Sequence, residues 1–471
     1  MRLGQLTGRD EPQTVTGFAI DHRRVAPGNV FGAFQGTQVN GEDFIPAAVA
    51  AGAIAVVARP EAVVTGAVHI ADDTPRARFA RVAADFYAPF PETAVAVTGT
   101  NGKTSTVEMT RQLWRMTGHH AASIGTLGVT TAQDQLSTGL TTPDIVTFLS
   151  NVAGLAREGV THLAFEASSH GLSQYRTEGL PVHAAAFTNL SRDHLDYHGD
   201  MAAYFTAKMR LFAEVLQPDG TSVVWVDDPW ADQVIDLARM RGNRLMTVGE
   251  HGEAIRLVAR EPSLLGQALT IEFDGAQHRV KLPLIGRYQA ANALIAAGLV
   301  IATGGEPTAT FANLARLSPV RGRLERAVIT RAGAPVYVDY AHTPDAIEAA
   351  IAALKPHTEG RLIVVLGAGG DRDPGKREPM GQVAAAHADR VIVTDDNPRS
   401  EDPAEIRRAI LKGAPDATEV PDRREAIALA VAEAGPNDIV LLAGKGHEQG
   451  QIVRDLVLPF DDVTVAREVA A

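Results

Sequence analysis

The feature that most limits how this chain can fold is the segment Thr98–Thr104, which reads TGTNGKT. The apolar run Ala94–Val97 comes directly before it. The segment Ser105–Met116, which follows it, places Met109, Leu113 and Met116 on one helical face. Strand, glycine-rich turn and helix in this order form a loop whose backbone N–H groups can surround phosphate oxygens. The segment therefore predicts a nucleotide-binding domain built on a parallel sheet.

Two side chains of this loop have a predicted role of their own. The ammonium of Lys103 can reach the β- and γ-phosphates of a nucleotide, and the hydroxyl of Thr104 can ligate Mg²⁺. The segment departs from the common G-x-x-x-x-G-K-[ST] pattern, because Val97 stands where that pattern has its first glycine. The residues expected to bind the nucleotide here are Gly99, Thr100, Asn101, Gly102, Lys103 and Thr104.

Composition excludes several classes of protein. At about 150 residues per domain, the 471 residues suggest about three domains. The hydrophobic share of 45% and the charged share of 21% exclude disorder, collagen and coiled coil as the main description. A net charge of −12 argues against nucleic-acid binding, which rests on a basic surface. The chain has no cysteine, which excludes disulfides, thiolate metal sites and cysteine nucleophiles.

Targeting signals are not evident. The first residues lack the apolar core of a signal peptide. The longest weakly polar run, Phe44–Ala58, is shorter than the ~20 residues that a membrane span needs. We therefore expect a soluble, cytoplasmic protein without a membrane span.

The pattern along the chain predicts an α/β fold in three domains: residues 1–88, 89–317 and 318–471. Two prolines in Ala88–Pro91 interrupt the chain after the first domain. The middle domain is expected to be a parallel-sheet ATPase domain, with further buried strands at Leu163–Phe165 and Ala184–Phe187. These strands end at Glu166 and at Thr188-Asn189, and open α/β sheets bind ligands at the carboxyl ends of their strands.

The third domain is expected to be Rossmann-like. Its strand signals alternate with helical segments, which indicates a second parallel sheet. The strands are expected at Val336–Val338, Leu362–Leu366, Val391–Val393 and Ile439–Leu442. Pro344 and Pro403 suit the first turns of two of the helices between them.

From these residues alone two function classes stay open. One is an enzyme that spends ATP on bond formation, and the other is a nucleotide-gated binding protein without chemistry. The N-K-x-D motif of GTPase switches is absent, which weakens the second class.

Beyond the loop, several segments in order resemble the Mur ligase family, which builds bacterial peptidoglycan precursors. They are Thr141–Asp144, Glu166–Leu172, Thr188–Asp196, Lys208, Gly286–Asn292, Asp339–Asp345, Asp396–Arg399 and Gly444–Glu448. The match spans nearly the whole chain. It is similar to those members that add the third amino acid to UDP-MurNAc-L-Ala-D-Glu, a cytoplasmic step that supports cell-wall synthesis and cell division.

The resemblance implies an ATP-dependent peptide ligase of the EC 6.3.2 class. ATP phosphorylates a carboxylate, an amine attacks the acyl phosphate, and phosphate leaves. The implied catalytic residues are Lys103, Glu166, His194 and Lys208. The resemblance also implies that Thr104, Glu166, His194 and Lys208 hold Mg²⁺, with Lys208 modified to a carbamate. Without the resemblance, His194 would be interpreted as a hydrogen-bonded core histidine, because histidine is unusual for Mg²⁺.

The resemblance assigns three groups of binding residues. It places Asn292, Arg323 and Asp339 around ATP, and implies that the third domain closes over the nucleotide. The residues matched to UDP-MurNAc-dipeptide binding are Thr141, Thr142, Ser168, Gln174 and Arg176. Near the N-terminus the chain departs from the family: Asp21-His22-Arg23 replaces the usual D-S-R, and Asn40-Gly41-Glu42 replaces D-G-H.

The segment Asp396–Arg399 resembles that of members using meso-diaminopimelate. Arg399 can pair with the distal carboxylate of that substrate through its planar guanidinium. The expected diaminopimelate-binding residues are Arg372, Asp396, Asn397, Arg399, Gly444 and Glu448. Lysine or ornithine remains an alternative substrate, and a folylpolyglutamate synthase-like ligase is a more distant alternative. We expect a monomer.

Overall fold

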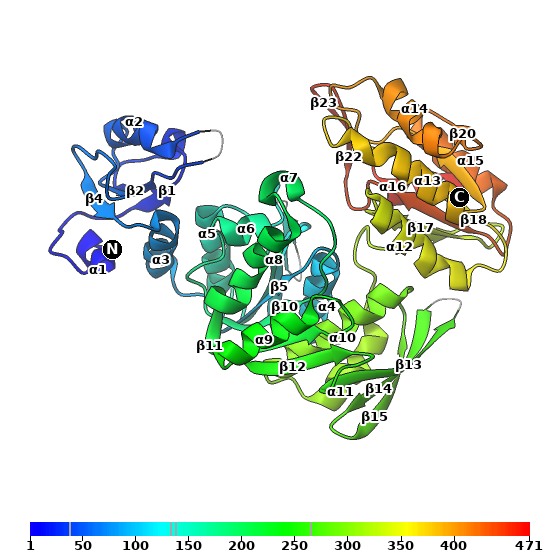
Figure 1. Cartoon of the computed structure of the whole chain (residues 1–471), viewed down its shortest axis with the longest axis horizontal. Helices are drawn as coiled ribbons and strands as arrows, with labels where there is room; N and C mark the ends of the chain where they lie inside the picture. Colours follow the sequence, from blue (N-terminus) through cyan, green and yellow to red (C-terminus); the bar gives the residue numbers. More distant parts are fainter. Residues whose placement is uncertain (37–38, 132–133, 137–138, 264–265) are drawn as a thin grey trace. The chain divides into compact units, whose positions relative to one another are not determined.

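The computed structural model describes residues 1–36, 39–131, 134–136, 139–263 and 266–471 (Figure 1). The chain packs into two compact units, residues 1–256 with 294–310 and residues 257–293 with 311–471. Three elements include residues of both units: β13 (Ile255–Ser263), α10 (Arg287–Ala302) and α11 (Pro307–Asn313). Each unit is described by itself below.

The first unit begins with a small parallel sheet of four strands in the order β1-β2-β3-β4. Its strands are β1 (Gly17–Ala19), β2 (Asn29–Gly32), β3 (Ala55–Ala58) and β4 (Val68–Ala71). The short helix α1 (Leu3–Thr7) precedes it, α2 (Ile45–Ala50) leads into β3, and α3 (Pro75–Tyr87) ends just before the two prolines.

The central sheet of the first unit has the strand order β12-β11-β10-β5-β9-β6-β7-β8. Strands β12 to β6 are parallel, and the last two pair antiparallel. They are β5 (Thr93–Thr98), β6 (Ala121–Gly125), β7 (Gly128–Thr130), β8 (Gln135–Leu136), β9 (His162–Glu166), β10 (Val182–Phe187), β11 (Leu216–Trp225) and β12 (Arg244–Gly249). The three strands predicted in this region, at β5, β9 and β10, are confirmed.

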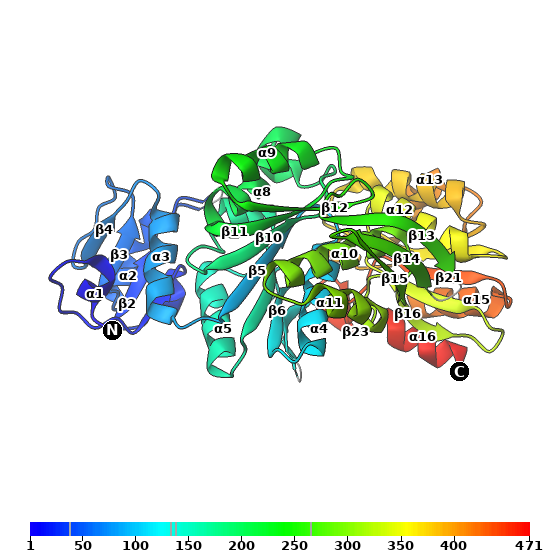
Figure 2. The same ribbon diagram turned by 90° about the horizontal axis from the view of Figure 1, so that it is seen from below.

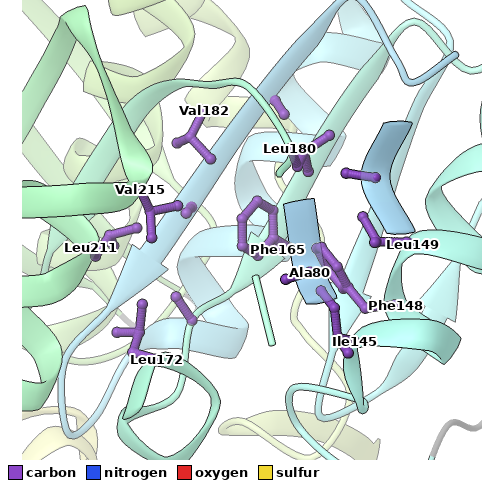
Figure 3. Close-up of a cluster of buried hydrophobic side chains, with 14 of the residues drawn as sticks. Ala80, Ile145, Phe148, Leu149, Phe165, Leu172, Leu180, Val182, Leu211 and Val215 are labelled. Atoms are coloured by element: carbon purple, nitrogen blue, oxygen red, sulfur yellow. The ribbon is translucent and has the colours of Figure 1, made fainter. Parts of the chain in front are cut away.

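Helices cover both faces of this sheet (Figure 2), which is why its strands are continuously apolar. The helices of this part of the chain are α4 (Lys103–Met116), α5 (Ile145–Arg157), α6 (Ser169–Ser173), α7 (Leu195–His198), α8 (Met201–Arg210) and α9 (Ala231–Arg241). In the core, Phe148 of α5 packs on Phe165 of β9 with ring centroids 5.2 Å apart. Ala80 of α3 lies against the same cluster (Figure 3), so the N-terminal sheet is anchored to the central one through α3.

The second unit contains a six-stranded sheet in the order β16-β17-β21-β18-β19-β20. All neighbours are parallel except β16 and β17. The strands are β16 (Glu325–Ile329), β17 (Pro335–Asp339), β18 (Leu362–Leu366), β19 (Arg390–Val393), β20 (Thr418–Glu419) and β21 (Ile439–Ala443). The four strands predicted here, at β17, β18, β19 and β21, are confirmed.

Alternation along each strand divides the apolar side chains between two cores. In β18, for example, Val364 and Leu366 enter one core, and Ile363 and Val365 enter the other. The helices of this unit are α12 (Pro344–Leu354), α13 (Arg377–His387), α14 (Pro403–Gly413), α15 (Arg423–Glu433) and α16 (Asp462–Ala470). Pro344 and Pro403 are the first residues of their helices, as predicted.

Two antiparallel pairs in the second unit were not predicted. They are β14 (Gly266–Phe273) with β15 (Ala276–Leu282), and β22 (Gly450–Val453) with β23 (Leu456–Pro459). Among the residues that the structure describes, no helix combines the length and apolarity that crossing a bilayer requires.

Candidate active site

The predicted phosphate loop connects β5 to α4 and depends on two glycines. Gly102 has φ +86° and caps α4, so the helix begins at Lys103, two residues earlier than predicted. Gly99 has φ +146°, and a Cβ there would collide with the hydroxyl oxygen of Thr188. Backbone in this region favours glycine. A side chain at position 99 is therefore excluded both by conformation and by space.

The loop after β10 supports the phosphate loop from the neighbouring strand. The Thr188 hydroxyl donates to the Asn101 carbonyl at 2.6 Å, and Asn189 Nδ2 donates to the same carbonyl at 3.0 Å. In return, the backbone N–H of Thr100 donates to the Asn189 carbonyl at 2.9 Å. The polar residues predicted at this strand end therefore hold the phosphate loop in place.

Two lysines converge on the carbonyl of Gly99. Lys103 Nζ lies 3.0 Å from it and Lys208 Nζ lies 2.8 Å from it. Lys208 is fully buried, with its ammonium 4.4 Å from the centre of the Tyr204 ring. Burial, together with the positive charge of Lys103, holds the pKa of Lys208 well below 10.5. This environment favours the neutral amine of Lys208.

Glu166 ends β9 and is buried beside the turn after β6. Its carboxylate accepts from the backbone N–H of Thr126 at 2.7 Å and from the Thr126 hydroxyl at 3.2 Å. Gly125 permits this approach, since a Cβ there would collide with the carboxylate. The strand-end position predicted for Glu166 is confirmed, and hydrogen bonds fix its carboxylate in one orientation.

His194 lies in a group of aromatic rings after β10. Its ring centroid is 4.9 Å from that of His170 and 6.1 Å from that of Tyr204. The His194 side chain is 47% exposed, so it is not a core histidine. Partial desolvation lowers its pKa, with Asp193 opposing the shift, and burial lowers the pKa of His170 to about 4. Both imidazoles are therefore neutral near pH 7 and can offer a nitrogen lone pair.

The predicted metal ligands do not form a preassembled carboxylate and imidazole cage. Within the described ranges, no group of three histidine, aspartate or glutamate side chains is arranged to hold a metal ion. Of the predicted set, Glu166 and Thr104 supply oxygen donors and both are buried. Any further oxygen donor from the set would have to come from a modified Lys208.

The residues predicted to bind the UDP-MurNAc-dipeptide form one hydrogen-bonded network in the first unit. Arg176 donates to the Thr142 carbonyl at 2.9 Å and to Gln174 Oε1 at 2.7 Å. Thr142 Oγ1 lies 2.9 Å from Ser168 Oγ, which caps α6. Thr141 joins through the Thr126 hydroxyl at 3.1 Å. The structure therefore brings all five of these residues together with Glu166.

In the two N-terminal segments that depart from the family, the first side chain of each caps a turn. The Asp21 carboxylate accepts from the backbone N–H of Arg23 at 3.0 Å. The Asn40 side chain accepts from the backbone N–H of Glu42 at 3.2 Å. Arg59 pairs with Glu42 at 2.8 Å. These contacts give each segment a local structural role.

The three remaining predicted ATP residues lie together in the second unit. Gln289 Nε2 donates to the Arg323 carbonyl at 2.9 Å, and Asn292 Nδ2 lies 3.5 Å from Gln289 Oε1. Asp339, the last residue of β17, accepts from the backbone N–H of Leu324 at 2.7 Å. Burial raises the pKa of Asp339 to about 6, against the attraction of Arg323. Its carboxylate is ionised at pH 7.

The predicted amino-acid site is built on the loop after β19 and the loop after β21. Asp396 and Asn397 are buried, and Gly444 has φ +116°, where a Cβ would collide with the Asp396 carboxylate. Asn397 Nδ2 donates to Glu448 Oε2 at 2.7 Å. Two segments about fifty residues apart in the sequence are therefore joined by side-chain contacts.

Arg399 is held through its backbone by the β22–β23 hairpin. Its N–H donates to the Ile452 carbonyl at 3.0 Å, and its carbonyl accepts from the Arg454 N–H at 2.7 Å. Arg399 Nη1 donates to the Gly370 carbonyl at 2.7 Å. Arg372 is exposed, and its charge acts on Asp371 and Tyr340. Both arginines predicted to bind diaminopimelate therefore belong to the same region.

Lys445 was not among the predicted site residues, although it lies in the segment Gly444–Glu448 that resembles the family. Lys445 is fully buried, and its ammonium faces three polar side chains of the amino-acid site. A lysine between two glycines gives no signal of burial in the sequence. Only the close approach of the segment 396–397 in the fold reveals its surroundings.

Three family models match successive parts of the chain. They describe the Mur ligase family catalytic domain (residues 14–85), the Mur ligase middle domain (residues 97–300) and the Mur ligase glutamate ligase domain (residues 322–446). The boundaries 1–88, 89–317 and 318–471 remain a prediction.

Curated relatives are similar over almost the whole chain. A UDP-N-acetylmuramoyl-L-alanyl-D-glutamate–2,6-diaminopimelate ligase of Zymomonas mobilis subsp. mobilis is 60% identical, covering 98% of this chain and 96% of the relative. A ligase with the same name from Caulobacter vibrioides is 49% identical, covering 95% and 94%.

Solved structures share the fold. A ligase structure with that same name is similar with a TM-score of 0.76 and 32% identity, covering 100% of this chain and 98% of the other. The folylpolyglutamate synthase of Mycobacterium tuberculosis complexed with ADP has a TM-score of 0.65 and 20% identity, covering 84% of this chain and 93% of the other. At that identity the second likeness concerns the fold alone.

Proposed function

The chain belongs to the Mur ligase family, and from this premise we propose that it joins meso-diaminopimelate to UDP-MurNAc-L-Ala-D-Glu at the expense of ATP. The products would be the UDP-MurNAc-tripeptide, ADP and phosphate. The observation that carries the choice of amino acid is the charged cluster at Asp396, Asn397, Arg399 and Glu448. It offers both a carboxylate and a guanidinium to a side chain that ends in an ammonium and a carboxylate.

In the first step, a carboxylate oxygen of the dipeptide attacks the γ-phosphorus of ATP and ADP leaves. The negative charges of the carboxylate and the phosphates repel, so positive groups must lie between them. We assign this role to Lys103, which the phosphate loop already holds beside Gly99 and Thr100. The network of Arg176 and Gln174 would hold the dipeptide for this attack.

In the second step, the amine of the incoming amino acid attacks the acyl phosphate carbon. A tetrahedral intermediate forms, and it collapses to the amide as phosphate leaves. Phosphorylation is needed because a free carboxylate has no good leaving group. Asn292, Arg323 and Asp339 are proposed to bind the nucleotide, with Asp339 accepting hydrogen bonds from the ribose hydroxyls.

Mg²⁺ fits the residues that the family resemblance assigns to it only in part. Glu166 and Thr104 supply the oxygen donors that Mg²⁺ prefers, whereas His194 supplies a nitrogen. We propose that these residues, together with a carbamate on Lys208, hold Mg²⁺, which would neutralise phosphate charge when bound. The neutral amine favoured at Lys208 supports the carbamate, because the uncharged form is the one that reacts with CO₂.

Product analysis tests the proposal. The purified protein is given ATP, Mg²⁺ and UDP-MurNAc-L-Ala-D-Glu, and phosphate release is measured with and without meso-diaminopimelate, L-lysine or L-ornithine. We expect phosphate only when an amino acid is present, fastest with meso-diaminopimelate, with the tripeptide as the other product. Fastest turnover with lysine or ornithine would change the substrate, and nucleotide binding without a peptide product would indicate a binding protein.

We also propose that the protein acts as a monomer in the cytoplasm, where ATP and nucleotide sugars are available. Size-exclusion chromatography with light scattering tests the first statement. A mass near twice the 49.9 kDa of the chain would contradict it.

A further inference from the structure

The amino-acid site contains a buried cation that the proposed reaction does not use. Lys445 follows Gly444 after β21, and its side chain is fully shielded from solvent. Its ammonium lies 3.0 Å from Asn397 Oδ1, 3.4 Å from Asp396 Oδ1 and 3.4 Å from Glu448 Oε2. Burying a charged group is unfavourable in free energy unless its partners make up for the water it loses. These partners are the residues proposed to recognise the amino acid.

Lys445 and the backbone N–H of Ile452 together fix which way the Asn397 amide points. Asn397 Oδ1 accepts from Lys445 Nζ and from the backbone N–H of Ile452 at 2.9 Å. Its Nδ2 is therefore directed at Glu448, to which it donates at 2.7 Å. With two donors facing Oδ1 and a carboxylate facing Nδ2, the reversed amide would lose all three contacts. Both the oxygen and the nitrogen of the Asn397 amide are therefore hydrogen-bonded within the protein.

Glu448 receives both of these contacts on one oxygen. Oε2 accepts from Asn397 and from Lys445, whereas Oε1 has no hydrogen-bond donor among the described residues. The Glu448 side chain is 31% exposed, whereas Lys445 and Asn397 are buried. One oxygen is thus fixed in the protein, and the other is presented at the accessible side of the site.

These contacts leave the second oxygen of Glu448 as the acceptor available to a ligand. A carboxylate oxygen without a donor from the protein suits an ammonium group. We propose that Lys445 is a positioning residue: through Asn397 it orients Glu448 so that its second oxygen accepts the distal ammonium of a diamino diacid. This inference rests on the proposed function and deepens it.

The alternative is that Lys445 only neutralises the buried charge of Asp396. Three variants separate the two roles: Lys445→Met, Asp396→Asn, and the double variant Lys445→Met/Asp396→Asn. Lys445→Met leaves Asp396 without a counter-charge and is expected to melt at a lower temperature. The double variant removes that uncompensated charge, so its stability should recover even if the single variant folds poorly.

The kinetic test compares meso-diaminopimelate with 2-aminopimelate, which keeps both carboxylates and lacks the distal amine. For Lys445→Met and for the double variant we expect the KM for meso-diaminopimelate to rise by roughly 10- to 100-fold, the loss of a charge-assisted contact. For Lys445→Met, the KM values for ATP, UDP-dipeptide and 2-aminopimelate should stay within about twofold. The double variant also lacks the Asp396 carboxylate, so only its stability and its KM for meso-diaminopimelate are compared. Lys355→Met, which removes a surface ion pair in the same unit, serves as the matched control.

Several results would overturn the inference. One is a double variant that regains both stability and the low KM for meso-diaminopimelate, which would make Lys445 a counter-charge only. Others are a Lys445→Met protein with unchanged KM values, or one in which the KM values for both amino acids rise equally. If the wild-type protein itself makes no tripeptide, the proposed function fails instead, so the two failures are distinguishable.

Discussion

The phosphate loop and the amino-acid site are built in opposite ways. The loop Thr98–Thr104 is a single stretch of backbone, shaped by two glycines and supported by carbonyl and amide contacts from the next strand. The amino-acid site is a set of charged side chains from two distant segments that meet around Lys445. Backbone N–H groups suit the phosphates of a nucleotide, which are the same whichever amino acid is added. Charged side chains can distinguish one amino acid from another.

The two regions also differ in the contacts that stabilise them. Beneath the amino-acid site, Arg423 and Asp462 form a fully buried ion pair at 2.7 Å, and Arg423 also donates to the Ala443 carbonyl, directly before Gly444. The phosphate loop contains no buried ion pair of this kind among the described contacts: its glycines, the Thr188 contact and the amines of Lys103 and Lys208 on the Gly99 carbonyl hold it. Changes to charge should therefore affect stability most strongly in the second unit.

The largest effect is expected for Asp462→Ala. Removing one partner leaves Arg423 as an uncompensated buried charge, which costs about 3–5 kcal/mol. The free energy of unfolding, from urea titration, measures this loss. The control is Glu468→Ala on the same helix, whose surface pair with Arg424 should contribute less than about 1 kcal/mol. Equal losses in the two variants would show that the buried ion pair stabilises the second unit no more than a surface pair does.

Next in size is Lys208→Ala, in the phosphate-loop region. We expect kcat to fall by about 10²- to 10³-fold with every amino acid, as when one stabilising group is removed from a transition state. A small added carboxylic acid should restore part of the activity by standing in for the carbamate. Lys412→Ala, on the exposed face of α14, is the control. Full activity of Lys208→Ala would refute the carbamate.

A smaller and more selective effect is expected for Arg399→Ala. Loss of a charge-assisted contact costs about 1.5–3 kcal/mol, so the KM for meso-diaminopimelate should rise by about 10- to 100-fold. The KM for ATP should stay within about twofold, and Arg408→Ala, at an exposed ion pair, should change neither. If the two KM values rose together, Arg399 would not select the amino acid.

The extent to which the sequence predicts these two regions follows from the same contrast. The phosphate loop is encoded in seven consecutive residues, so its strand, turn and helix were predicted with an error of two residues at the helix start. Helix starts are difficult to place because a left-handed glycine such as Gly102 can cap a helix on its own.

The amino-acid site was predicted only as a list of residues. Nothing local in Gly444–Glu448 indicates that Lys445 is buried, because two of its three partners, Asp396 and Asn397, lie about fifty residues earlier in the chain. The hairpin of β22 and β23 was missed for a related reason: its outer strand, Leu456–Pro459, is exposed, so it lacks the alternating pattern of a half-buried strand.

The smallest effect concerns pH and Asp339. Its pKa is raised to about 6 from 3.8 by burial, so the folded protein binds a proton more tightly than the unfolded chain does. The stability that this proton provides is complete below pH 3.8 and is lost as pH rises through about 6. The melting temperature of the wild-type protein, relative to Asp339→Asn, should therefore fall by a few degrees between pH 4 and pH 7. A constant difference between the two proteins would contradict the assignment.

The central claim is that the phosphate loop activates a carboxylate of the dipeptide and that the amino-acid site then supplies the amine. It is tested most directly by following oxygen. The UDP-dipeptide is prepared with ¹⁸O in its terminal glutamyl carboxylate, and the phosphate released with meso-diaminopimelate is analysed by mass spectrometry. The account predicts one ¹⁸O atom in each phosphate, carried over when the acyl phosphate is cleaved. Phosphate without the label, released alongside the tripeptide, would contradict it.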